Sequence, residues 1–243
     1  MEVLDFDLAA AEHSGKEFRK STGSFPDKSS ASAPASAERE RADCLACRAD
    51  NGLSGRSRDA TLAIMTHRAR DLALRHFQWN DGHADVWKIF RDPDALTGVV
   101  RGLAATFEGE GITAVCGIES RGFLLGAAVA IELGVGFIAV RKQNGLFPGE
   151  KLTRQTPPDY RRLRHELRIQ RTSLTPSDRV LMVDDWVETG SQALSVKAMV
   201  EEVGSHWGGC AVIVDQASEA CRRTLDVRGL VTAAELPEWN PQR

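Results

Sequence analysis

Two adjacent carboxylates stand at the end of an apolar run, and a hydroxyl-bearing helix start follows them closely. The run is 180–183, the acids are Asp184 and Asp185, and residues 189–191 read Thr-Gly-Ser. Carboxylates beside buried apolar side chains are costly to desolvate unless hydroxyl groups or metal-bound waters satisfy them. The free amides and partial positive charge of a helix N-terminus bind phosphate groups. The segment 180–193 is therefore suited to a sugar phosphate, and the alternative is a strand end followed by an ordinary helix cap without a ligand.

Three cations earlier in the chain are placed to neutralise phosphate groups. Arg121 begins an apolar segment, where an arginine is unfavourable to the helix dipole unless an anion lies nearby. Arg141 and Lys142 follow a second apolar run. The plain alternatives are an arginine that merely begins a helix and a solvated pair of loop cations.

The elements that must position these side chains alternate between strands and helices. Helical periodicity is found over 60–77, 95–107, 121–133 and 191–203, and apolar runs predict strands at 112–116, 137–140, 179–183, 210–214 and 230–232. This order predicts an α/β fold, a mostly parallel sheet flanked by helices. Because residues 121–133 are nearly all apolar, we expect that helix to be sandwiched. Alternation over 163–170 predicts an extended ribbon.

Ligands of such sheets bind beyond the carboxyl ends of the strands. The loops 117–122, 141–150 and 184–192 each follow a predicted strand and carry the candidate side chains. Two other phosphate-binding motifs match the sequence less well. The glycines at 117 and 122 lack the lysine and hydroxyl of a P-loop, and no GxGxxG opens a helix after the first strand.

Bulk composition limits the alternatives. The 243 residues are 42% hydrophobic and 27% charged, with a formal net charge of −3, which gives no case for nucleic acid or a membrane partner. An odd set of five cysteines and the lack of a secretory signal indicate reduced thiols in the cytoplasm. Residues 1–59, including Cys44 and Cys47, are expected to be a disordered low-complexity extension, and 60–243 the folded domain.

Several motifs, in order, resemble the type I phosphoribosyltransferase family, and most closely its adenine phosphoribosyltransferases. Residues 180–193 are similar to the ribose-phosphate motif, and 117–123 (Gly-Ile-Glu-Ser-Arg-Gly-Phe) to the first pyrophosphate loop. The stretch 141–149 is similar to the second basic loop, and 85–93 lies where the family has a phenylalanine-arginine-aspartate segment. The resemblance covers about residues 80–235 and implies a Rossmann-like fold.

The resemblance implies transfer of ribose 5-phosphate from phosphoribosyl diphosphate to a nucleobase, with Mg²⁺ as cofactor and a homodimer as the assembly. It implies catalytic roles for Asp184, Asp185 and Arg121, with magnesium held through waters on the two acids. The residues that would bind phosphoribosyl diphosphate are Ser120, Arg121, Arg141, Lys142, Asp184, Asp185, Val187, Glu188, Thr189, Gly190, Ser191 and Gln192.

The half of the site that would hold the base departs from the family. Ala84 replaces the arginine of the base-binding segment, Gln216 follows Asp215 where the family has an apolar residue, and Arg161 and Arg162 stand where the mobile loop has glutamate and tyrosine. The phosphate loop also differs, since Ser191-Gln192 replaces Gly-Thr. The residues that we expect near the base are Phe123, Trp186, Asp215 and Gln216.

Three alternatives stay open. The basic stretch 154–171 is either a closing loop or a solvated ribbon. The protein is either a transferase for a purine-like base or a non-enzymatic regulator that binds phosphoribosyl diphosphate or a nucleotide. A weaker third candidate is a phosphohydrolase with Asp184 as nucleophile, which would need further acids and a lysine.

Overall fold

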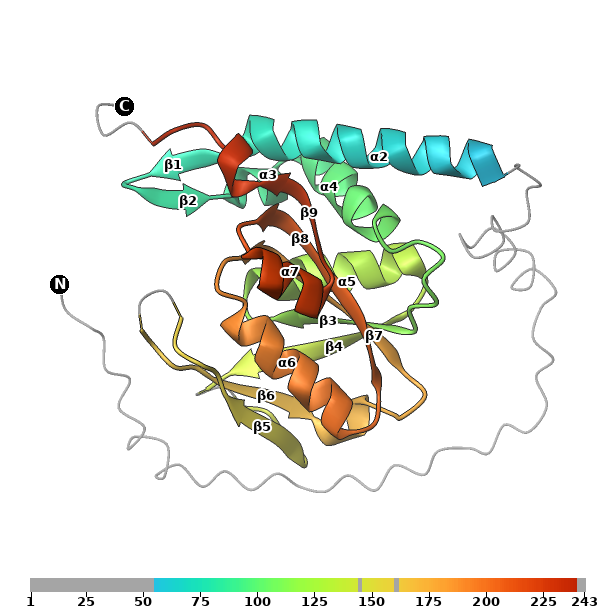
Figure 1. The fold of residues 1–243 in the computed structure, drawn as a ribbon, viewed down its shortest axis with the longest axis vertical. Helices are drawn as coiled ribbons and strands as arrows, with labels where there is room; N and C mark the ends of the chain where they lie inside the picture. The colour runs from blue at the N-terminus through green and yellow to red at the C-terminus, as the bar shows by residue number, and fades with distance from the viewer. Residues whose placement is uncertain (1–54, 144–145, 160–161, 240–243) are drawn as a thin grey trace, which may run out of the picture. The chain divides into compact units, whose positions relative to one another are not determined.

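A seven-stranded sheet forms the centre of the protein in a computed structural model that describes residues 55–143, 146–159 and 162–239. Its strand order is β5-β6-β4-β3-β7-β8-β9 (Figure 1). The strands β4, β3, β7, β8 and β9 are parallel, and β5 and β6 form an antiparallel ribbon at one edge. The strands are β3 (Ala114–Ile118), β4 (Gly136–Lys142), β5 (Lys151–Gln155), β6 (Glu166–Gln170), β7 (Arg179–Val187), β8 (His206–Asp215) and β9 (Val227–Thr232). The predicted mostly parallel sheet is confirmed.

Helices cover both faces of the sheet, as the repeated strand-helix order predicts (Figure 1). One face packs against α5 (Arg121–Leu133) and α4 (Pro93–Ala105), and α2 (Gly55–His76) packs on α4. The other face packs against α6 (Ser191–Glu202) and α7 (Glu219–Leu225). Successive residues of β7 alternate between the two cores, with Leu181 and Val183 in one and Met182 in the other. This alternation buries both faces of the central strand.

A small hairpin and a short helix lie between α2 and α4. The hairpin strands are β1 (Gln78–Asn80) and β2 (His83–Asp85), and the helix is α3 (Trp87–Arg91). Asp92 then caps α4 by accepting a hydrogen bond from the amide of Ala95 at 2.8 Å. Two 3₁₀ turns, Arg171–Ser173 and Ala233–Glu235, complete the described elements.

Two expectations about individual elements are wrong, and a third is confirmed only in part. Helix α5 is buried on one face only, since the side chains of Leu124 and Ile131 remain 50% and 74% exposed. Strand β7 does not end at 183 but continues to Val187, so that the two acids lie within the strand rather than in a loop. The ribbon predicted over 163–170 is a strand only from Glu166, and its partner β5 carries no apolar signal of its own.

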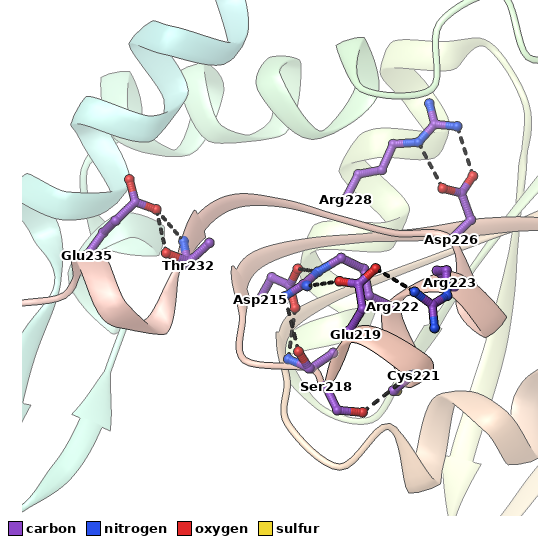
Figure 2. A network of polar contacts seen from close by, with 11 residues as sticks. Asp215, Ser218, Glu219, Cys221, Arg222, Arg223, Asp226, Arg228, Thr232 and Glu235 are labelled. Carbon is purple, nitrogen blue, oxygen red and sulfur yellow. Dashed lines mark hydrogen bonds and ion pairs between the residues drawn. The ribbon is translucent and has the colours of Figure 1, made fainter.

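The N-terminal helix is tied to the C-terminal part of the domain. Arg70 in α2 forms an ion pair of 2.7 Å with Glu235. Glu235 also accepts hydrogen bonds from the amide and hydroxyl of Thr232, both at 2.7 Å, which together lower its pKa to about 2 (Figure 2). Residues 1–54, including Cys44 and Cys47, lie outside the described residues. Among the helices that are described, none combines the length and apolar character needed to cross a membrane.

Candidate active site

A cavity of about 1180 Å³ opens at the carboxyl ends of β3, β7 and β8. Most of the residues that the sequence marked as ligand-binding line it: Ser120, Arg121, Lys142, Asp184, Asp185, Trp186, Val187, Glu188, Thr189, Gly190, Ser191, Gln192 and Gln216. Three of the marked residues, Phe123, Arg141 and Asp215, are not among its lining residues. The three predicted loops therefore meet at one site, as the carboxyl-end rule for open α/β sheets requires.

Asp185 is joined to Arg121 across the mouth of this cavity. The Nε atom of Arg121 lies 2.7 Å from Oδ2 of Asp185. Asp185 is buried, with 7% of its surface exposed, and the Arg121 guanidinium also lies 5.8 Å from the centre of the Trp87 ring. The arginine at the helix start thus has its anion. An incoming anionic ligand could share or replace this partner.

Asp184 is the acid of the pair whose negative charge is less favourable in this environment. Its Oδ1 atom accepts a hydrogen bond from the amide of Asp185 at 2.9 Å. A methyl group on Gly122 would lie only 3.1 Å from the same oxygen, so α5 approaches the carboxylate closely. Desolvation within this packed strand, followed by the charge of Asp185, raises the pKa of Asp184 well above its usual range. Ribose hydroxyls or a cation would relieve that cost.

Glu119 is a site residue that the sequence analysis did not single out. Its carboxylate accepts hydrogen bonds from Arg141 at 3.0 and 3.3 Å and from the amide of Lys142 at 3.2 Å. Hydrogen bonding to Arg141 lowers the pKa of Glu119. Arg141 is not among the residues that line the cavity, whereas Glu119 and Lys142 are. The sequence signal that could have identified Glu119 is its position at the end of one predicted strand, since Arg141 and Lys142 stand at the end of the next.

The start of α6 presents open backbone amides to the cavity. Gly190 is the N-cap residue, with φ of 71°, and the helix has no side-chain cap. The hydroxyl of Thr189 instead accepts a hydrogen bond from the amide of Ser191 at 3.4 Å. A helix N-terminus with uncapped amides and a glycine at the turn suits the close approach of a phosphate group.

Gly190 is expected to tolerate no side chain. A Cβ there would clash with Sγ of Cys221 in α7, and the backbone of Gly190 is in the left-handed region that disfavours any side chain. We predict that Gly190→Ala destabilises the fold by about 2–4 kcal/mol, since strain and overpacking add, and weakens nucleoside monophosphate binding. Thermal denaturation and calorimetry measure the two effects.

Gly134→Ala is the matched control, because Gly134 has φ of 70° with open space where its Cβ would lie. It carries the backbone strain without the clash, so it should cost only about 1–2 kcal/mol. Adding Cys221→Ala to Gly190→Ala should recover part of the stability. Equal losses in the two glycine variants would show that contact with Cys221 is unimportant.

The candidates for the base divide between the cavity and its surroundings. The indole Nε1 of Trp186 donates a hydrogen bond to Oε1 of Gln216 at 2.9 Å, and both residues line the cavity. Phe123 packs against Phe137, with ring centres 5.8 Å apart. Asp215 is buried and accepts hydrogen bonds from Arg222 and from the amide of Ala217. Trp79 and His83 also line the cavity, and the sequence analysis assigned them no role.

A parallel sheet with paired acids, a facing arginine and an open helix N-terminus at one edge defines a sugar-phosphate-binding α/β protein. The phosphoribosyl transferase domain model matches residues 87–240. The chain belongs to this family, and it is a phosphoribosyltransferase.

Named relatives agree with this assignment. The chain is 38% identical over 148 residues to an adenine phosphoribosyltransferase of Methylobacillus flagellatus, covering 61% of this chain and 82% of the relative. It is 39% identical over 144 residues to that of Methylococcus capsulatus, covering 59% and 82%.

Solved structures show the same similarity. Adenine phosphoribosyltransferase from Rhodothermus marinus matches 68% of this chain and 98% of its own, with a TM-score of 0.60 and 28% identity. The Giardia lamblia enzyme, solved with 9-deazaadenine, matches 66% and 95%, with a TM-score of 0.58 and 30% identity.

Proposed function

We propose that the chain transfers the ribose 5-phosphate group of phosphoribosyl diphosphate to a purine nucleobase and releases pyrophosphate. The observation that carries this proposal is the single cavity onto which the acid pair, Arg121, Lys142 and the uncapped start of α6 all open. The spacing of these groups along the sheet edge suits a ligand with an anion at each end and a sugar between them.

Each group has a role in this reaction. The bond from C1 of the ribose to the diphosphate oxygen breaks with both electrons leaving on pyrophosphate, and a base nitrogen forms the new bond to C1. Arg121 and Lys142 stabilise the leaving negative charge. Asp184 and Asp185 hold the ribose hydroxyls and offset positive charge on the ring. The α6 start grips the 5′-phosphate, whose binding energy orients C1. Arg141 supports this site through Glu119.

The donor set at the cavity fits magnesium bound with its substrate. The described residues contain no cluster of three or more histidine, cysteine, aspartate or glutamate side chains able to hold a metal ion by themselves. Mg²⁺ characteristically uses one or two carboxylates, several waters and substrate phosphates. Asp184 and Asp185 would hold it, directly or through waters, and when bound it would neutralise the diphosphate and ribose oxygens.

Pyrophosphate release with a panel of purines, phosphoribosyl diphosphate and Mg²⁺ tests the proposal. We expect release with at least one purine and only slow release without a base. Tight binding of phosphoribosyl diphosphate with no turnover on any base would instead favour the non-enzymatic regulator. Membership of the phosphoribosyl transferase family disfavours the phosphohydrolase.

The assembly and location proposed for this enzyme are a homodimer in the cytoplasm. Support for a second copy comes from the apolar face that Leu124 and Ile131 leave exposed on α5. Support for a reducing compartment comes from Cys116, Cys210 and Cys221, which are free thiols.

A further inference from the structure

The side chain of Gln216 is oriented by a donor that cannot act as an acceptor. The indole N–H of Trp186 only donates, so the amide oxygen of Gln216 must face it, at 2.9 Å. The amino group of the same amide therefore points elsewhere and presents two N–H donors. Because Gln216 lines the cavity, these donors are available to a ligand there.

The loop that carries Gln216 is held from both sides. The backbone amide of Gln216 donates a hydrogen bond to the carbonyl oxygen of Val187 at 2.9 Å. On either side of it, Asp215 accepts from Ala217 N at 2.8 Å, and Arg222 bonds both Asp215 at 2.6 Å and the carbonyl oxygen of Ala217 at 3.1 Å. Figure 2 shows Arg222 reaching from α7 back to Asp215. A polar group supported in this way keeps its geometry for recognition, which an unsupported surface glutamine does not.

The wall beside Gln216 is aromatic. The ring centres of Trp186 and Phe77 are 6.5 Å apart, and those of Phe77 and Trp79 are 5.2 Å apart. Trp79 and Trp186 both line the cavity, as does Ala84, whose small side chain leaves space. A flat heterocycle fits against such a wall with one polar edge directed at the amide.

We propose that Gln216 selects the base and that the site prefers a purine with a carbonyl group at C6 over adenine. This inference rests on the proposed function. An oxopurine presents two acceptors, O6 and N7, on one edge, whereas adenine presents the N7 acceptor beside the N6 amino donor. A glutamine reads adenine by accepting from N6 and donating to N7. Here Trp186 directs the amide oxygen toward the indole and occupies one of its two lone pairs, whereas both N–H donors remain to suit O6 and N7.

Gln216→Glu is the sharpest test, because glutamate keeps an acceptor for Trp186 and replaces the two donors by an acceptor. The ratio of kcat/KM for hypoxanthine to that for adenine is measured from pyrophosphate release. We expect a ratio above one in the native protein and a fall of about tenfold or more in the variant, the usual effect of mispairing one hydrogen bond at a site. Gln155→Glu, at an exposed glutamine of β5 outside the cavity lining, controls for the added charge.

Trp186→Phe is the second variant and should act in the same direction. Without the indole donor the Gln216 amide is free to rotate, so discrimination against adenine should weaken. A native preference for adenine, or an unchanged base ratio in Gln216→Glu, would overturn the inference while leaving the proposed transferase intact. Failure of every purine despite binding of phosphoribosyl diphosphate would overturn the proposed function, and this inference with it.

Discussion

Asp184→Asn is expected to lower kcat/KM by about 10²–10³-fold, on the scale of losing one transition-state electrostatic contact, while raising the melting temperature at neutral pH. The asparagine side chain cannot carry the negative charge that the ribose ring and magnesium require. It does retain an oxygen that accepts from the backbone amide of Asp185, and it adds a donor for the Asp185 carboxylate. The uncharged side chain therefore suits the free protein better than the native one does.

The stability gain should depend on pH with a defined sign. The folded-state pKa of Asp184 is raised by burial and by Asp185, so folding favours its protonated form. The contribution of Asp184 to the free energy of unfolding is fully present below its unfolded-state pKa. It is lost as pH rises through its folded-state pKa. The asparagine variant does not titrate there, so its advantage should be absent in acid and grow toward neutral pH. Each recovered kcal/mol should raise the melting temperature by about 2–4 °C.

Two further variants make this result interpretable. Asp185→Asn removes the partner of Arg121 and should reduce activity without raising stability. Asp71→Asn, on the exposed surface of α2, should change neither quantity measurably. Full activity in Asp184→Asn, or a melting temperature below the native value at neutral pH, would contradict the assignment of this acid.

Arg121→Gln is expected to lower kcat/KM by about 10²–10³-fold, on the same scale for a lost charge contact. Arg121 lies at the start of α5 beside Asp185, where it can stabilise a leaving pyrophosphate but is not needed to hold the 5′-phosphate at α6. Affinity for phosphoribosyl diphosphate should therefore fall much more than affinity for a purine nucleoside monophosphate, which has no diphosphate. Steady-state kinetics and calorimetry with both ligands separate the two effects.

Arg101→Gln is the matched control for this change. Arg101 is an exposed arginine of α4 with a long ion pair of 3.6 Å to Glu132, and its loss should leave both affinities unchanged. An equal loss of affinity for both ligands in Arg121→Gln would mean that Arg121 supports the whole site rather than the diphosphate end.

The two halves of the cavity differ in how they relate to the family. The sugar-phosphate half carries the acid pair, the arginine and the open helix start that the family motifs imply. In the proposed base half, Ala84 and Gln216 line the cavity where the family resemblance implies an arginine and an apolar residue, and Trp186 lines it beside them. The relatives are named for adenine, and the base panel with Gln216→Glu decides whether this chain shares that substrate.

Local patterns were sufficient for the fold class and for most of the sugar-phosphate site. Helix α5 has the predicted bounds, and the uncapped start of α6 follows the acid pair as expected. Both signals are local, since apolar period and helix starts depend on neighbouring residues. The strand β5 was missed because it has one buried residue, and its position depends on pairing with β6 across the ribbon.

The sequence by itself determined which loops carry charge and that they meet at the carboxyl edge of a parallel sheet. Only the tertiary structure decided which charges line the cavity and how they pair: Arg141 bonds to Glu119 and is not in the lining, and Arg121 pairs with Asp185 at the cavity. It also decided that Trp186 orients Gln216. These outcomes depend on side chains that are distant in sequence coming within about 3 Å of each other, the range of a hydrogen bond, and no local pattern encodes that distance.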